Sequence, residues 1–539
     1  MAPKHERTKS SDDMLRHPSP KKAKEIDQHT PYEALLDHMD KQNADQEPRT
    51  ILHWFRSKEL RAEDNRALMA ASRKSKEASA PLVTCFLFSP KDMEWHGTSP
   101  VRVDFTLETL RLLQSQLKEM NIPLAILTAE SRGDKGPVML NFLKKHNISH
   151  MFANLEYEVD EMRRDISLFE RLESDGMDTA FHLFHDQSVV EPGTMKGGAG
   201  TPQKVFTPYY KHWLDKVAKE PELLDTEGLP EANDKEVTTK FKDLFDSSIP
   251  SLPKSKPFAS EEERKRLRKL WPAGHAAAKK RLDDFLKNKA STYKTNRSTP
   301  AADNSSRLSP YFSAGVLSVR EALSAASEAD GRAPGTFDGD AGIASWVREI
   351  VFREFYRQRL VGTPHDSMNL PHNLKFDYVR WEDDGEGWRR WCEGATGVPF
   401  VDAGMRQLRH EGWMHNRLRM NTASYLRTNL LIDYRRGERF FAETLVDWDL
   451  SNNHQGWEPS YTVFNPVVQA EKCDPDGDYI RKWVPELKDV EGKAVFDPYH
   501  RLDKKEFEKL GYPKPHVDFK ESRQRCIERY KQDMAEADI

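Results

Sequence analysis

The chain has 539 residues, too many for one ordinary hydrophobic core, so two or more domains are expected. Hydrophobic residues make up 37% and charged residues 32%, as in soluble globular proteins. The net charge of -4 gives no overall sign of a nucleic-acid-binding protein, so any such binding would need a local basic face. The four scattered cysteines form neither a zinc spacing nor a disulfide framework, and no apolar run suits a membrane span or a signal peptide.

The N-terminal segment, residues 1–49, is rich in Lys, Asp, Gln and Pro and poor in large apolar residues. This composition predicts a disordered basic and polar extension. Its stretch PSPKKAKE (18–25) fits a nuclear import signal and a solvated tail equally well.

Residues 50–182 alternate short apolar runs with amphipathic stretches. Strands are expected at 51–55, 82–88, 124–128 and 150–155, and helices at 106–120 and 136–147. This alternation predicts an α/β domain with a doubly wound parallel sheet.

The remaining chain divides into a linker, a helical domain and a tail. Residues 183–258 contain many Pro, Gly, Glu, Asp and Ser and predict a long connecting loop, whereas 259–528 show helical periodicity and predict an all-α domain before a tail at 529–539. Eight of the twelve tryptophans lie between Trp346 and Trp483, which indicates a large aromatic core or stacking around a flat cofactor.

One polar segment of the helical half combines small hydroxyls with a cation. Ser305, Ser306 and Ser309 flank Arg307 at an expected helix N-terminus. Hydroxyls, free backbone N–H groups and a guanidinium form a good anion seat, although helix capping alone explains the serines more simply.

Two expected helices carry charges among aromatic side chains. Trp346, Glu349 and Arg353 share one helical face, for which a surface helix with ion pairs is the simpler explanation. In GWMHNRLRMN (412–421), Trp413 and Arg417 align on one face, and a buried core would not leave such an arginine unpaired.

A third segment, LVDWDLSNNHQGW (445–457), contains Asp447, Asp449 and Asn453. A pair of aspartates two residues apart suggests a divalent cation, but no further ligand cluster follows, and no metal site is predicted. The acids can instead accept hydrogen bonds from an arginine and from a ligand.

Together and in order, the motifs of residues 50–525 resemble those of the DNA photolyase/cryptochrome family, and most closely class I cyclobutane pyrimidine dimer photolyases of fungal type. They are WFRSKELRAEDNRAL, EYEVDEMRRD, KVFTPYYKHW, SSRLSPYFSAG, WVREIVFREFY, GATGVPFVDAGMRQL, GWMHNRLRM, VDWDLSNN and FNPVVQAEKCDPDGDYIRKWVPEL.

The resemblance implies an α/β N-terminal domain joined by a long loop to an all-α domain that binds one FAD. It implies a carbon–carbon lyase in which light drives an electron from reduced FAD to a flipped-out dimer. The alternative is a cryptochrome-like blue-light photoreceptor that keeps FAD and has reduced or lost repair.

The resemblance also assigns residues to the flavin. The matching positions hold the pyrophosphate and adenosine side, pair beside the isoalloxazine or face its N5 nitrogen. They are Tyr293, Ser305, Ser306, Arg307, Leu308, Ser309, Trp346, Glu349, Arg353, Arg419, Asp447, Asp449 and Asn453.

Other matching positions face the DNA lesion, and Glu349 would hydrogen-bond the flipped bases. The substrate-side residues are Arg297, Glu349, Phe352, Asn416, Arg417 and Met420. Relatives that repair (6-4) photoproducts place proton-donating histidines where Asn416 and Met420 stand, so the sequence favours cyclobutane dimers.

Three features depart from the family pattern. Phe352 replaces a tryptophan that stacks on the lesion, and Tyr434 replaces the middle tryptophan of an electron-supply chain that Trp457 and Trp381 would begin and end. The segment after Trp457 is also shorter than in relatives. These departures favour the photoreceptor alternative, whereas Asn453 fits repair.

Asp160 and Glu161 match positions that hold a methenyltetrahydrofolate antenna; a deazaflavin or no antenna is the alternative. The expected partner is DNA containing cyclobutane dimers, with no membrane, and the expected state is a monomer in the nucleus, with the mitochondrion as a second location.

Overall fold

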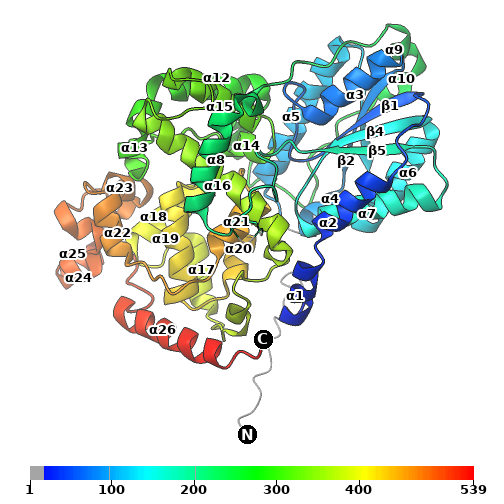
Figure 1. The fold of residues 1–539 in the computed structure, drawn as a ribbon. Helices are drawn as coiled ribbons and strands as arrows, with labels where there is room; N and C mark the ends of the chain where they lie inside the picture. The colour runs from blue at the N-terminus through cyan, green and yellow to red at the C-terminus, as the bar shows by residue number, and fades with distance from the viewer. Residues whose placement is uncertain (1–16, 96, 199, 201) are drawn as a thin grey trace.

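The computed structural model describes residues 17–95, 97–198, 200 and 202–539. A layered α/β body packs beside a larger helical body, as Figure 1 shows. The short basic stretch at 18–25 lies within the described part, whereas residues 1–16 of the N-terminal extension lie outside it.

The α/β body is built on five parallel strands in the order β3-β2-β1-β4-β5. They are β1 (Thr50–Phe55), β2 (Leu82–Phe88), β3 (Leu124–Thr128), β4 (Ile148–Asn154) and β5 (Ala180–Phe184). The doubly wound parallel sheet is therefore confirmed, and β5 is a strand that the sequence did not predict.

Alternate residues of each strand face opposite layers, as strand geometry requires. Ile51 and Phe55 pack with α3 (Arg66–Glu77) and α5 (Pro100–Glu119), whereas Leu52 and Trp54 pack with α6 (Lys135–Lys145) and α7 (Val159–Ser174). Helices thus cover both faces, which explains why β1 and β4 are buried along their whole length.

The predicted disorder of the N-terminal extension is wrong for residues 20–41. They form α1 (Pro20–Gln28) and α2 (Pro31–Lys41), with Ser19 and Thr30 as N-caps and proline at the first helical position of each. Leu35 is fully buried against the α6–α7 layer, so burial of an apolar face stabilises a helix whose charged composition suggested disorder.

The segment predicted as a linker contains α8 (Phe206–Lys219), which packs along α16 (Ala341–Gly362). The Trp213 indole N–H donates to Glu354 at 2.7 Å, so this part of the connection is fixed rather than loose. At the other end of the chain, α26 (Phe519–Ala535) continues through most of the predicted tail.

The helical body is formed mainly by the C-terminal half. The elements used below are α13 (Tyr293–Asn296), α14 (Ser309–Ser313), α17 (Gly385–Glu393), α18 (Pro399–Glu411), α19 (Asn416–Ser424), α20 (Tyr434–Ala442) and α21 (Leu450–Trp457). Across the described chain, no helix combines the length and apolarity that a bilayer crossing needs.

A buried ion-pair network joins the two bodies. Arg320 of the helical body donates to Asp64 at 2.9 Å and to Asp186 at 2.7 Å, and all three side chains are almost fully buried. Removing one member would leave a buried charge uncompensated, so the network fixes how the bodies pack.

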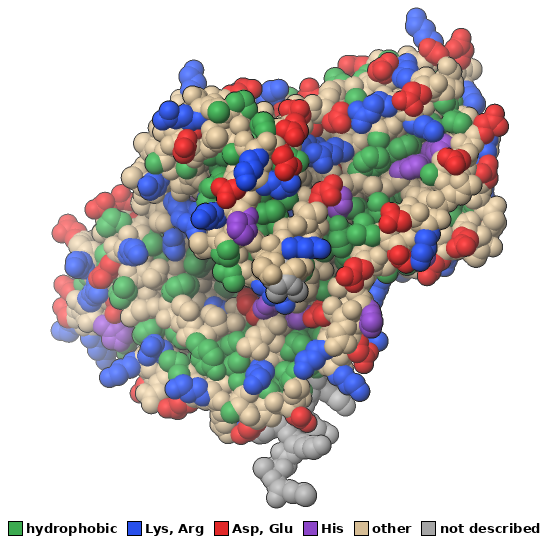
Figure 2. Space-filling model, viewed as in Figure 1, with side chains coloured by type: hydrophobic (Ala, Val, Ile, Leu, Met, Phe, Trp, Pro, Cys, Tyr) green, Lys and Arg blue, Asp and Glu red, His purple; other side chains and the backbone are tan. Residues whose placement is uncertain are grey.

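On the face of the molecule that Figure 2 shows, basic and acidic side chains are interspersed.

Candidate functional site

The serine–arginine turn lies directly before α14. Arg307 adopts a left-handed backbone conformation with φ of 52°, which is uncommon for a residue other than glycine. Its guanidinium holds this turn by donating to Asp303 at 2.9 Å and to Glu411 at 3.1 Å. Ser305 and Ser306 are half-buried, Ser309 is exposed and Leu308 is buried in the core.

Trp413 joins this turn to α19. The guanidinium carbon of Arg307 lies 4.6 Å from the centre of the Trp413 ring, and that of Arg419 lies 6.0 Å from it. The indole N–H also donates to the Ser309 hydroxyl at 3.2 Å. Two predicted cofactor segments that are a hundred residues apart are therefore neighbours around one aromatic side chain.

Arg419 and Asp447 form the ion pair that the resemblance implies, with 2.7 Å between Nη2 and Oδ2. Arg419 also donates from Nε to the Met414 carbonyl at 2.8 Å. The second carboxylate oxygen of Asp447, Oδ1, is buried without a hydrogen-bond partner among the described residues. A buried oxygen without a hydrogen bond lowers the stability of the fold, so we expect a donor group of a bound ligand at this atom.

Asp449 and Asn453 belong to the start of α21. Asp449 accepts from the Asn452 backbone N–H at 2.9 Å as the N-cap and forms a buried ion pair with Arg357. The Asn453 amide donates to the Glu438 carbonyl at 3.0 Å, which holds the orientation of this carboxamide.

Helix α16 carries four predicted residues along one side. Trp346 is buried with its ring centre 5.0 Å from that of Phe285, which also lies 5.7 Å from the ring of Tyr293 in α13. Half-exposed Glu349 forms an ion pair with Arg297. Two residues that were predicted on the substrate side are therefore neighbours in the structure.

Arg353 lies deeper on the same helix. It donates to the carbonyls of Gln187 at 2.8 Å and Phe312 at 3.2 Å, and its Nε has no partner among the described residues. Burial, together with nearby Arg357, lowers the pKa of Arg353 to about 9.

Phe352 stacks on Phe206 of α8, with ring centres 3.9 Å apart and planes at 30°. The aromatic that replaces the family tryptophan is therefore partly covered by the connecting segment. Less of its face is available to another ring than the sequence alone indicated.

The N-terminal turn of α19 forms an accessible polar surface. Asn416 and Met420 are exposed, and half-buried Arg417 donates to the Ser298 hydroxyl at 2.9 Å. Ser298 directly follows Arg297, so the Arg417 and Glu349 sides of the predicted lesion site are connected through residues 297–298.

His415, the N-cap of α19, is the histidine nearest to this surface in sequence. Its Nδ1 accepts from the Arg417 backbone N–H at 3.2 Å. Burial and the neighbouring arginines lower its pKa to about 4, so the imidazole is neutral near pH 7 and is a poor proton donor.

The three predicted electron-supply residues do not form one continuous series of ring contacts. Trp381 lies 6.1 Å from Tyr434, whereas Trp457 packs 4.9 Å from Phe441 and 6.0 Å from Trp391. Trp391 in turn stacks on half-exposed Trp388 of α17 at 5.5 Å. The sequence missed this second aromatic series.

The predicted antenna residues point in different directions. Asp160 pairs with Arg132 at 2.8 Å near the surface, whereas Glu161 lines a cavity of about 150 Å³ at the carboxyl ends of β1, β2 and β4. Burial and Glu158 raise the pKa of Glu161 to about 7. Asp449 lines the same cavity, which therefore lies next to the α21 segment.

Two further residues of the site were missed, although the sequence carried a signal for each. Arg357 lies one helical turn beyond Arg353, and a buried Asp449 requires such a cation. Glu411 directly precedes the GWMHNRLRM motif and pairs with Arg307.

The family models match both bodies. The model described as "DNA photolyase" matches residues 51–229, and "FAD binding domain of DNA photolyase" matches residues 346–532. A deoxyribodipyrimidine photo-lyase of Neurospora crassa is 38% identical over 90% of this chain and 82% of its own length. The chain belongs to the DNA photolyase family.

Other relatives and solved structures agree with this assignment. The Escherichia coli deoxyribodipyrimidine photo-lyase is 35% identical over 89% of this chain and 98% of its own. A bacterial class III photolyase from Agrobacterium tumefaciens superposes with a TM-score of 0.76 at 28% identity, covering 91% of this chain and 98% of its own. A Synechocystis cryptochrome, at 23% identity and a TM-score of 0.73, covers 90% of this chain and 99% of its own and shows the shared fold.

The residues of this photolyase fit the FAD that the matched domain implies. Within the described part of the chain, the buried Asp447 Oδ1 atom has no donor and the buried Arg353 Nε atom has no acceptor. The Arg307 turn adds a cation beside exposed Ser309. A ligand with both N–H and anionic groups matches this donor set.

Proposed function

We propose that this protein is a deoxyribodipyrimidine photo-lyase that uses light and FAD to split cyclobutane pyrimidine dimers in DNA. The proposal depends chiefly on the grouping of the Arg307 turn and the Arg419–Asp447 pair around Trp413, in a chain whose relatives carry that name.

When bound, FAD supplies the electron that enters the dimer after light absorption and returns after the ring opens. The Ser305–Ser309 turn would hold its pyrophosphate, and Tyr293 and Trp346 would pack against it. The Asp447 carboxylate would accept from a flavin N–H. Asn453, oriented by the Glu438 carbonyl, would present its carboxamide to the flavin edge.

Glu349 would accept or donate a hydrogen bond at the flipped bases after exchanging its contact with Arg297. The dimer stacks and pairs poorly, so flipping it costs less than flipping an intact pair. Asn416 and Met420 would contact the lesion, and Arg417 and the released Arg297 would contact phosphate. DNA binding should therefore weaken steeply as salt rises.

A buried neutral His415 supports the choice of lesion. Cyclobutane splitting needs no proton relay, whereas (6-4) repair in the related enzymes uses protonated histidine on this helix. With Asn416 and Met420 at the surface and His415 uncharged, α19 offers no such donor at its exposed turn.

The antenna proposal is methenyltetrahydrofolate near Asp160 and Glu161. The cavity beside Glu161 supports a ligand at the sheet's switch point, between β1 and β4, where the strand order reverses. Its volume of about 150 Å³ is below the usual range for ligand pockets, so a chromophore would need side chains such as Lys58 to move.

We further propose a monomer that acts in the nucleus, with the mitochondrion as a second location. Lys21, Lys22 and Lys24 are exposed on α1, as an import signal requires. A relative from Saccharomyces cerevisiae that is 33% identical is named as mitochondrial.

The cryptochrome-like photoreceptor is the less favoured function. The covered face of Phe352 supports it, but relatives that are 38% and 35% identical are named as photo-lyases. Illumination of the purified protein with an oligonucleotide containing one thymine dimer tests the choice. Light-dependent loss of the dimer is expected, whereas flavin absorbance without dimer loss would favour the photoreceptor and overturn the repair proposal.

A further inference from the structure

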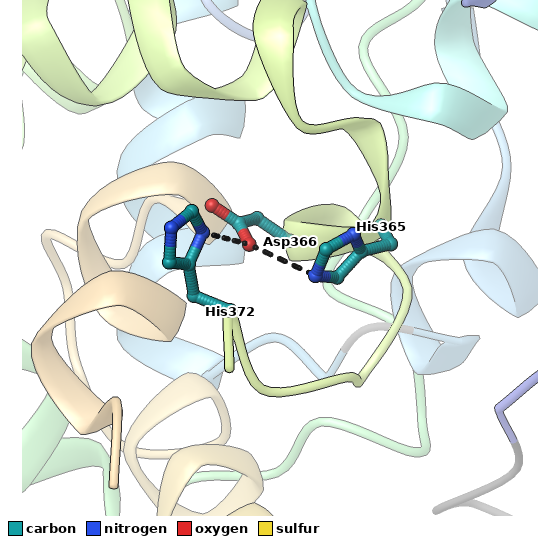
Figure 3. A group of neighbouring side chains, drawn as sticks. All are labelled: His365, Asp366 and His372. Carbon is teal, nitrogen blue, oxygen red and sulfur yellow. Dashed lines mark hydrogen bonds and ion pairs between the residues drawn. The ribbon is translucent and has the colours of Figure 1, made fainter. Parts of the chain in front are cut away.

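A cluster of two histidines and one aspartate lies outside the flavin and lesion residues. His365 and Asp366 follow α16 in the short 3-10 turn η6 (Pro364–Ser367), and His372 lies in the loop beyond it. Figure 3 shows both imidazoles directed at the carboxylate of Asp366. One nitrogen from each histidine and one carboxylate oxygen lie within 4.8 Å of one another.

The distances suit a small cation. The Asp366 Oδ1 atom lies 3.1 Å from His372 Nδ1 and 3.6 Å from His365 Nε2. Tetrahedral zinc with bonds of about 2.0–2.1 Å places neighbouring ligand atoms roughly 3.3 Å apart. The two oxygen–nitrogen distances are therefore close to the edge length of such a tetrahedron.

Hydrogen bonds to neighbouring side chains orient His365 and Asp366 so that Nε2 and Oδ1 can bind an ion. Asp27 of α1 accepts from His365 Nδ1 at 2.6 Å, the carboxylate–histidine arrangement that orients metal-binding imidazoles. Arg359 donates to the other oxygen of Asp366 at 3.1 Å, so Oδ1 faces the histidines.

A second observation points to a missing ligand. His365 is buried, and its Nε2 has no hydrogen-bond partner among the described residues. With the Nδ1 proton directed at Asp27, the Nε2 lone pair faces a carboxylate oxygen. That contact is repulsive unless a cation or a second proton lies between the two atoms.

We propose that His365 Nε2, Asp366 Oδ1 and His372 Nδ1 bind one zinc ion, with water as the fourth ligand. The side chain of His372 is 36% exposed, which gives the ion and the water a path from solvent. Because Asp27 of α1 accepts a hydrogen bond from His365, the ion would link α1 to the turn after α16, the helix that carries Glu349. In the sequence, the site corresponds to the pattern His-Asp-x5-His, from which no metal site was predicted.

The test is zinc content of the full-length protein after incubation with zinc chloride and gel filtration. Wild type should retain about one zinc per chain, and cobalt in its place should give the visible absorption of a tetrahedral site. H372A should lose both signals. The matched control is H500A, which removes an exposed histidine that is also paired with an aspartate, Asp497, at 2.8 Å. It should behave as wild type.

Wild type without retained zinc would overturn the proposal and leave a protonated His365 between Asp27 and Asp366. Equal zinc retention by H372A would also overturn it, because the ion would then lie elsewhere. If H372A fails to fold, H372Q, which keeps a polar side chain of similar reach, replaces it. None of these readouts depends on flavin or on dimer repair.

Discussion

The Arg419 guanidinium donates to Asp447 at 2.7 Å and leaves the other carboxylate oxygen buried, with no donor among the residues that the structure describes. The pair thus fixes a negative charge and points one acceptor away from the arginine. The D447N variant keeps the shape of the side chain but removes the charge, so a bound flavin loses a charge-assisted hydrogen bond.

We expect D447N to purify with several-fold less flavin per protein, measured as the ratio of flavin to protein absorbance. E386Q is the control, because Glu386 is exposed and pairs with Arg389 and Arg390 of the same helix, α17. Equal flavin content in D447N and wild type would show that Asp447 does not contact the cofactor.

Glu349 gives a prediction for the chemical step. The E349Q variant keeps hydrogen bonding but cannot carry the charge that pairs with Arg297. Hydrogen bonds to charged groups contribute about 1.5–3 kcal/mol, so dimer splitting per absorbed photon should fall by about tenfold to a hundredfold. Dimer loss under limiting light measures it, with E393Q on the exposed end of α17 as the control. Full repair by E349Q would remove Glu349 from the lesion contacts.

The sequence predicted the sheet better than its edges and extensions. The strands β1 to β4 were recognised, whereas the short strand β5 (AFHLF) was missed, although its apolar residues around one histidine resemble the ILHWF run of β1. Helix α2 was missed because PYEALLDHMDK is charged, although Thr30 and Pro31 form a clear helix start. Its stability comes from burial of Leu35, which only the tertiary structure reveals.

The candidate site residues were predicted through motifs, and their long-range partners were not. Arg419 and Asp447 form the ion pair that the resemblance implied, whereas the pairing of Arg297 with Glu349 was not predicted. The covering of Phe352 by Phe206 depends on how α8 packs against α16, and no local pattern in the sequence encodes that contact.

Electron supply to a bound flavin should follow Trp391 rather than Tyr434. The Tyr434 hydroxyl is buried without a hydrogen-bond partner among the described residues, so its oxidation has no acceptor for the phenolic proton. The Trp391 indole donates to the Thr422 carbonyl at 3.0 Å and contacts both Trp457 and Trp388.

W391F should therefore slow light-driven flavin reduction more than Y434F does, as followed by flavin absorbance under continuous illumination with an external reductant. W483F changes another partly buried tryptophan of the same core cluster and should have little effect. A larger loss in Y434F than in W391F would place the electron path through the tyrosine.

Gly437 permits the close packing of Trp457 against α20. A Cβ atom at this position would lie 2.3 Å from Trp457 Cη2 and 2.5 Å from Leu426 Cδ2. G437A should lower the free energy of unfolding by about 1–3 kcal/mol through overpacking, despite the higher helix propensity of alanine. Urea denaturation measures it, with G385A at an open site as the control. Unchanged stability in G437A would mean that Trp457 has room to shift.

His415 makes stability depend on pH on the acid side. Its folded pKa of about 4 lies below the ordinary histidine pKa of 6.5, so the unfolded chain binds a proton that the native chain excludes. The stabilisation is present above pH 6.5 and is lost as pH falls through 4. By the linkage relation, this group accounts for a loss of about 2–3 kcal/mol over that window.

H415N keeps a hydrogen-bond acceptor at the N-cap without a titrating ring, and its unfolding free energy should fall less between pH 6.5 and 4. H500N, at an exposed histidine, should retain the wild-type slope, and a wild-type slope in H415N would show that His415 is not the group responsible.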